Sequence, residues 1–231
     1  VRETGDGTKW ITTDSGLLKF KNGKSRLYST GDGLISNDLN CIYIDKRDVI
    51  FLGAPAGLCR MENGGFTNYT SRHGLFSGGV NFILEDDFNR LWMSGRNGIC
   101  RVQKKELTAF ARGKVRKINA KVYNVKDGLK TTLFQSTGLK SKDGSLWFSA
   151  ILGLVHFDPA EFDNVVNSNP PPVVIEEFKV DGSTFHVPRN GKGNAVVSLP
   201  PGSSRLEFYY TALSFLEPGK IRFKIQLAGY D

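Results

Sequence analysis

Short apolar stretches separated by polar turns recur along the first two thirds of the chain. Residues 39–45 (LNCIYID) and 80–86 (VNFILED) have the composition of β-strands, and each comes after a Gly-Leu pair. Polar turns follow at 46–48 and 87–89, and then an aromatic strand, a glycine turn, a third strand and an outer strand. Long runs of helix-forming residues are absent. The pattern predicts a unit of four antiparallel strands.

The unit repeats. Its marker is an aromatic residue, present as Trp10, Phe51, Trp92 and Trp147. A glycine stands six residues after each marker, as Gly16, Gly57, Gly98 and Gly153. The markers are 41, 41 and 55 residues apart, and the longer interval predicts an insertion within Phe110–Val125. A period of about 40–50 residues with several short strands is typical of β-propeller blades.

The repeat assigns structural roles to its apolar columns. A ring at the same place in each blade would fill the space between adjacent sheets, where burial contributes roughly 2–3 kcal/mol. We therefore interpret the four markers as blade core rather than as ligand-stacking residues. Cys41, Cys59 and Cys100 also fall at apolar core positions, where a free cysteine behaves as a small hydrophobic residue. We predict three free thiols.

A column of basic residues lies one position after the repeat position that holds Cys59 and Cys100. It consists of Lys19, Arg60, Arg101 and His156. Because neighbouring residues of a strand point to opposite faces, these side chains face away from the cysteines. A charge between packed blades needs a partner, so we favour interblade salt bridges or hydrogen bonds. A ring of basic groups that binds an anionic ligand is the alternative.

The loops that enter the innermost strands are the predicted ligand site, because propeller ligands usually lie over the central channel. These loops cover residues 35–40, 76–81 and 130–135. Their polar residues are the candidate ligand-binding residues, namely Asn37, Asp38, Asn40, Asn81, Thr131 and Gln135. Since Asn and Asp also stabilise turns, a purely structural role is the alternative.

The charge is unevenly distributed. The net charge is +8, and the segment from Arg101 to Lys126 holds nine Lys and Arg residues. This segment could bind anions or nucleic acid, or form a solvated loop and outer strand. The second interpretation is favoured because aromatic residues do not interleave with the charges as base stacking requires. We expect no nucleic-acid partner.

Catalytic patterns are not evident. The cysteines form no CxxC pair and the three histidines are scattered, so we expect neither a metal site nor a cofactor. The acidic cluster Glu85–Asp87 falls at a turn, where neighbouring side chains diverge. General acid/base chemistry on glycans needs two carboxylates across a cleft. We therefore predict that this chain is not an enzyme.

The motifs themselves resemble a known family. The pattern in Gly33–Tyr69, with a second copy in Gly74–Val102 and a third from Gly128, resembles the two-component regulator propeller repeat. The tail, from Asn169 onward, resembles the Y_Y_Y (triple-tyrosine) domain that follows such propellers. Tyr209, Tyr210 and Tyr230 fit its aromatic positions. Residues 221–229 (IRFKIQLAG) alternate as a strand with one face on a core.

The resemblance implies an all-β fold in two parts. Residues 1–166 would form about three and a half four-stranded β-propeller blades, which are part of a larger propeller. Residues 167–231 would form the N-terminal part of an immunoglobulin-like β-sandwich, left incomplete. The chain would then be a piece of a longer receptor. Its partners would be the remaining blades of that receptor or a second copy in a homodimer.

In that family, the propeller and the Y_Y_Y domain form the periplasmic sensor of a membrane-bound hybrid two-component system or sensor histidine kinase. The resemblance therefore implies a non-catalytic, extracytoplasmic sensor that binds a ligand, such as an oligosaccharide, and relays binding through the Y_Y_Y domain. Membrane contact would come only through flanking segments outside this sequence. A propeller enzyme that acts on glycans and a protein-interaction scaffold are the alternatives.

Overall fold

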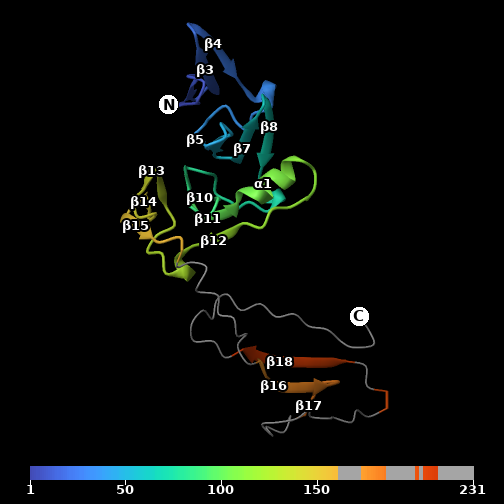
Figure 1. Cartoon of the computed structure of the whole chain (residues 1–231). Helices are drawn as coiled ribbons and strands as arrows, with labels where there is room; N and C mark the ends of the chain where they lie inside the picture. Colours follow the sequence, from blue (N-terminus) through green and yellow to red (C-terminus); the bar gives the residue numbers. More distant parts are fainter. Residues whose placement is uncertain (161–172, 186–200, 203–204, 213–231) are drawn as a thin grey trace. The chain divides into compact units, whose positions relative to one another are not determined.

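The computed structural model divides the chain into two compact units, Val1–Val165 and Val166–Asp231 (Figure 1). It describes residues 1–160, 173–185, 201–202 and 205–212.

The described residues of the first unit form four antiparallel sheets, each built from consecutive strands. Blade 1 consists of β1 (Arg2–Glu3), β2 (Lys9–Thr12), β3 (Leu17–Lys21) and β4 (Lys24–Tyr28). Blade 2 consists of β5 (Cys41–Ile44), β6 (Ile50–Ala54), β7 (Gly57–Glu62) and β8 (Gly65–Tyr69). Blade 3 consists of β9 (Phe82–Glu85), β10 (Arg90–Gly95), β11 (Gly98–Gln103) and β12 (Lys121–Tyr123). Blade 4 consists of β13 (Phe134–Lys140), β14 (Leu146–Ala150) and β15 (Gly153–Phe157).

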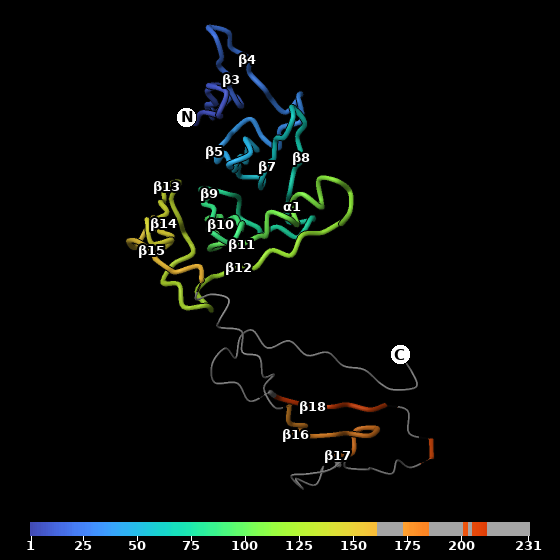
Figure 2. The backbone as a smooth tube through the Cα atoms, viewed as in Figure 1, coloured from blue at the N-terminus to red at the C-terminus, as the bar shows by residue number. Residues whose placement is uncertain are grey.

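The first strands of the blades contact one another in order, from β1 to β5, β9 and β13. Sheets that follow one another in the sequence therefore lie next to one another in the first unit (Figure 2). Short 3-10 turns lead from one blade to the next, at Thr30–Asp32, Ser71–His73 and Val125–Asp127. The predicted all-β fold with propeller blades is confirmed.

The repeated glycines have a steric cause. Gly57 has a φ of +141°, and a Cβ atom added to it would lie 2.3 Å from the carbonyl oxygen of Tyr69. Gly98 has a φ of +111°, and its Cβ would lie 2.1 Å from the carbonyl oxygen of Tyr123. Each glycine thus allows the third strand to start directly against the end of the outer strand.

Three of the four aromatic markers are buried between their own blade and the next. Trp10 packs into a cluster with blade 2 residues, Phe51 into one with blade 3, and Trp92 into one with blade 4. Trp147 is different, because it is only partly buried. Its ring lies 4.3 Å from that of His156, on the face of blade 4 that points away from blade 3.

The basic column contacts its own blades. Each basic residue pairs across the strands with the aromatic marker of its blade. Lys19 Nζ lies 5.4 Å from the ring centroid of Trp10, and Arg101 lies 5.7 Å from that of Trp92. Arg60 pairs with Glu62 at 2.8 Å on the same strand. For Lys19 and Arg60, contacts within the blade therefore replace the predicted interblade pairing.

The insertion lies earlier than predicted. It occupies residues 104–120, between β11 and β12, where blade 2 has a turn at 63–64. Helix α1 (Lys104–Ala111) opens it, and a loop then returns the chain to β12 (Figure 2). Leu107 is fully buried, and its carbonyl accepts a hydrogen bond from Tyr69 Oη at 2.8 Å. The helix is therefore fixed to blade 2 as well as to blade 3.

All three cysteines are free and buried, as predicted. Burial raises the pKa of each thiol, Cys41, Cys59 and Cys100, to about 12. The thiols are thus protonated core groups at neutral pH.

The second unit shows a three-stranded antiparallel sheet with the order β17-β16-β18. Its strands are β16 (Val173–Val180), β17 (Ser183–Phe185) and β18 (Leu206–Ala212). Tyr209 and Tyr210 are on β18, paired with Glu177 and Ile175 of β16. The immunoglobulin-like sandwich and the Y_Y_Y assignment stay predictions. Tyr230 and the strand predicted at 221–229 lie outside the described residues.

Candidate ligand pocket between blades 2 and 3

Two predicted ligand residues connect consecutive blades. Asn40 Nδ2 donates a hydrogen bond to the carbonyl oxygen of Val80 at 3.0 Å. Asn81, at the same repeat position, donates from Nδ2 to the carbonyl oxygen of Phe134 at 2.8 Å. Both amides therefore have a structural role between one blade and the next.

The other four predicted ligand residues lie near the same end of the strands and make local hydrogen bonds. They are Asn37, Asp38, Thr131 and Gln135. Asn37 Oδ1 accepts from the backbone N–H of Thr30 at 2.8 Å, and Gln135 Oε1 accepts from Ser149 Oγ at 2.9 Å. Ligand binding by these residues stays a prediction.

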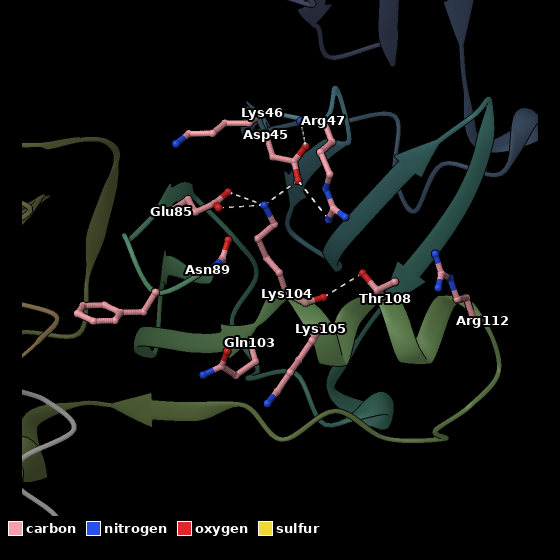
Figure 3. A pocket seen from close by; sticks show the side chains of 11 residues that line it. Asp45, Lys46, Arg47, Glu85, Asn89, Gln103, Lys104, Lys105, Thr108 and Arg112 are labelled. Carbon is pink, nitrogen blue, oxygen red and sulfur yellow. Dashed lines mark hydrogen bonds and ion pairs between the residues drawn. The ribbon is translucent and has the colours of Figure 1, made fainter.

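A pocket of about 690 Å³ opens at the opposite end of the strands. Asn40 precedes β5, whereas the pocket begins at Asp45, which directly follows β5. Its walls are the β5–β6 turn, the end of β9 with the β9–β10 turn, and helix α1 (Figure 3). The inserted helix therefore forms one side of a pocket between blades 2 and 3.

An ion-pair network forms the buried side of the pocket. Lys104 Nζ lies 2.6 Å from Asp45 Oδ2 and 2.8 Å from Glu85 Oε2 (Figure 3). The side chain of Asp45 is fully buried, and that of Lys104 is 10% exposed. Tyr43 Oη donates to Glu85 Oε2 at 2.8 Å. One lysine from the insertion thus binds two carboxylates that come from different blades.

The network shifts two pKa values. Burial by itself would raise the pKa of Asp45, but the hydrogen bond from Lys104 and backbone N–H groups outweigh burial and lower it. Burial and the hydrogen bond to Glu85 raise the pKa of Tyr43. Asp45 is therefore ionised and Tyr43 is protonated at neutral pH.

The rim of the pocket is basic. Lys46 and Arg47 come from the β5–β6 turn, and Lys105 and Arg112 come from α1 and its C-terminal end. All four side chains belong to exposed residues. Part of the basic segment from Arg101 to Lys126 thus borders a pocket.

The equivalent groove between blades 1 and 2 is smaller, at about 220 Å³. Its lining includes Thr4, Asp6, Asp48 and Lys19, and it has no inserted helix beside it. Three of the five basic residues that line the larger pocket, Lys104, Lys105 and Arg112, come from the insertion.

The sequence pattern does not indicate that Asp45 lies close to Glu85. It predicts Glu85 as part of the acidic turn cluster Glu85–Asp87, whose neighbouring side chains diverge, with no second carboxylate across a cleft. The repeat alignment does put Asp45 and Asp86 at the same position, which marks both as turn residues. Nothing in the sequence pattern, however, indicates that Lys104 reaches between the blades.

Comparisons with known proteins support the fold. No protein-family model and no curated protein matches the chain. The extracellular domain of a putative hybrid two-component system from B. thetaiotaomicron has a TM-score of 0.65 over 87% of this chain, at 22% identity. The extracellular domain of a putative one-component system from the same organism has a TM-score of 0.59 over 78%, at 20% identity.

The chain spans about a quarter of the length of these structures, 26% and 27% respectively. At this identity the comparison shows a shared fold. Among the described residues, the helices lack the length and apolar character needed to span a membrane. Within the same residues, no group of three or more His, Cys, Asp or Glu side chains is placed to hold a metal ion.

Proposed function

We propose that this chain is part of the extracytoplasmic sensor region of a two-component signalling receptor. The observation that supports it is the fold shared along 87% of the chain with the extracellular domain of a putative hybrid two-component system. In this proposal the chain is periplasmic and non-catalytic. Ligand binding by the propeller blades is relayed through the second unit, a Y_Y_Y domain, to a histidine kinase or another output.

The ligand in this proposal is a small molecule such as an oligosaccharide. The pocket between blades 2 and 3 has a volume within the roughly 300–1,000 Å³ typical of ligand sites. Its walls come from three separate segments, so a ligand there would bridge blade 2, blade 3 and α1. A change in how these parts pack is a direct way for binding to alter the domain.

Deletion of the gene that encodes the chain tests the proposal. The deletion strain and its parent are grown on a panel of polysaccharides and their oligosaccharides, and transcript levels are compared. We expect one set of genes to lose induction by one carbon source, and the intact gene to restore it. Identical transcript responses in both strains on every source would contradict a sensor role.

A glycan-cleaving enzyme is the second candidate, because Asp45 and Glu85 meet in the pocket. Their partners argue against it. Both carboxylates bind Lys104, and Asp45 has no exposed side-chain surface. Glu85→Gln separates the two functions, since an acid/base enzyme would lose nearly all hydrolysis of its glycan while a binding protein has none to lose.

Further blades of the same repeat are the proposed partners of the two outer faces. Phe20 and Leu27 of blade 1 are 41% and 48% exposed, and Leu139 and Leu154 of blade 4 are 56% and 70% exposed. Leu18 pairs with Leu27 across the strands of blade 1. It occupies the same repeat position as Cys59 of blade 2, and Cys59 is fully buried against blade 1.

These faces therefore have the composition of the two sides of an interblade contact. Light scattering tests this proposal on the isolated chain. We expect self-association that Leu27→Lys and Leu154→Lys each reduce. A chain that stays monomeric at high concentration, with or without these substitutions, would argue against blade-like contacts at both faces.

A further inference from the structure

The pocket between blades 2 and 3 has positive charge that its own carboxylates do not neutralise. Its lining contains five basic residues and two acidic ones. Asp45 and Glu85 both bind Lys104. Arg47 is only distantly associated with Asp45, at 3.9 Å, and its side chain is 69% exposed.

Arg112 has no ion pair with any acidic residue in the described part of the chain. The charge of Arg47 and Arg112 is therefore available to a ligand.

The two arginines approach the pocket from opposite walls. Lys104, Thr108 and Arg112 are spaced four residues apart, so they lie along one side of α1 and its C-terminal end. Arg47 extends from the β5–β6 turn toward the helix, and Arg112 rises from the end of the helix on the same side (Figure 3). Thr108 lies between Lys104 and Arg112 along this side of the helix. Its hydroxyl donates a hydrogen bond to the carbonyl oxygen of Lys104 at 3.1 Å.

We propose that this pocket binds an anionic group, a sulfate, phosphate or carboxylate, between Arg47 and Arg112. A guanidinium presents paired N–H donors that match the oxygens of such groups. Lys46 and Lys105 add positive charge at the rim. The buried network fixes Lys104 and with it the start of α1, so the wall that carries Arg112 is held in place before the ligand arrives.

The neighbouring groove supports this assignment by contrast. The groove between blades 1 and 2 has Asp6 and Asp48 in its lining and is less than half as large. Of the two grooves described, the one beside the insertion is the larger and has more basic than acidic residues in its lining. This proposal goes beyond the sensor function, because the purified chain can bind an anion whether or not it signals.

Isothermal titration of the purified 231-residue chain tests the proposal. The probes are inorganic sulfate, inorganic phosphate and glucuronate, with glucose as the neutral counterpart of glucuronate. The test variant is Arg47→Gln/Arg112→Gln. The control variant, Lys24→Gln/Lys142→Gln, removes the same amount of charge from exposed residues of blades 1 and 4.

We expect the wild type to bind at least one anion and to bind glucose at least tenfold more weakly. The test variant should lose at least tenfold in affinity for that anion, and the control variant less than twofold. Added NaCl should weaken binding by the wild type. Tighter binding of glucuronate than of sulfate and phosphate would identify an acidic sugar as the source of the anion, and the reverse order a free inorganic anion.

Circular dichroism confirms that the variants are folded, which is expected because both arginines are exposed. The proposal is overturned if no anionic probe binds the wild type, or if the test variant binds as tightly as the control. In either case the transcript experiment remains decisive for the sensor function, so the two failures are distinguishable.

Discussion

Blades 2 and 3 each have an aspartate at the same repeat position, but its side chain has different partners in the two blades. Asp45 and Asp86 stand at the same repeat position, directly after the innermost strand, and both are buried. Asp45 Oδ1 accepts from the N–H groups of Arg47 and Val49, at 2.8 and 3.0 Å. Asp86 Oδ1 accepts from the residues at the same two offsets, at 2.9 and 3.0 Å. The turn itself is therefore identical in the two blades.

The second carboxylate oxygen shows the difference. Asp86 Oδ2 accepts from Arg90 Nε at 2.5 Å and from Trp92 Nε1 at 2.6 Å, both in its own blade. Blade 2 has Val49 and Phe51 at these positions, and neither side chain can donate a hydrogen bond. Asp45 Oδ2 instead pairs with Lys104, which comes from blade 3. A single repeat position thus stabilises one blade internally and joins another blade to its neighbour.

The largest expected effect is the loss of Asp86. In Asp86→Ala the buried guanidinium of Arg90 loses the carboxylate of Asp86, and removal of one partner of a buried ion pair costs about 3–5 kcal/mol. Urea unfolding followed by tryptophan fluorescence measures the change. Asp87→Asn is the control, since Asp87 is exposed and its pair with Lys140 should contribute less than about 1 kcal/mol. Equal losses in the two variants would show that the internal network of blade 3 is not special.

The network that joins the blades should contribute somewhat less. Lys104→Met leaves Asp45 and Glu85 together without a cation, and we expect a loss of about 2–4 kcal/mol, because Lys104 is slightly exposed. Neutralising all three groups, in Asp45→Asn/Glu85→Gln/Lys104→Met, should recover most of that loss. The comparison is broken if the triple variant is less stable than Lys104→Met alone.

Acid should weaken the contribution of Asp45. The folded chain holds the pKa of Asp45 below its ordinary value of 3.8, so ionised Asp45 stabilises the fold fully above that value. The stabilisation is lost as the pH falls through the lower, folded-state pKa. Unfolding of the wild type and of Asp45→Asn, compared from pH 7 to pH 3, should show a gap that narrows with acidification. A gap that does not change with pH would contradict this role.

The smallest expected effect is a change in how fast the cysteine thiols react with a reagent. Cys100 and Cys41 lie in the core between blades 2 and 3, whereas Cys59 lies in the core between blades 1 and 2. All three should react slowly with a thiol reagent in the native protein, because they are buried and protonated. In Lys104→Met we expect Cys100 and Cys41 to react faster than Cys59, as mass spectrometry of the labelled chain would show. Uniform acceleration would indicate global rather than local opening.

The sequence was sufficient for the parts of the fold that repeat. The spacing of Trp10, Phe51 and Trp92 predicted the blades, because a strand order that recurs needs the same rings and glycines each time. Trp147 stands 55 residues after Trp92 and occupies the same repeat position, but it is only partly buried, since burial depends on the neighbour that covers the next face. Repetition predicts a residue's position in a blade, and packing determines its exposure.

The candidate pocket could not be predicted in the same way. It depends on α1, an eight-residue helix that follows the third strand of blade 3, where blades 1 and 2 have short turns between β3 and β4 and between β7 and β8. Its sequence lacks a long apolar periodicity, and β12, which follows it, is only three residues long. The insertion was therefore placed too late, and Lys104 was counted with a basic segment rather than with Asp45. Contacts between an insertion and a repeat leave no periodic signal.

The amide bridges of Asn40 and Asn81 run in one direction along the chain. In each bridge the donor belongs to the earlier blade and the acceptor to the later one. Synthesis delivers a repeat of about 41 residues in roughly 2–8 s, at about 5–20 residues per second. Each blade therefore emerges from the ribosome when the donor that it will meet has already been synthesised. The blades can assemble in the order of translation, with every finished blade serving as the template for the next.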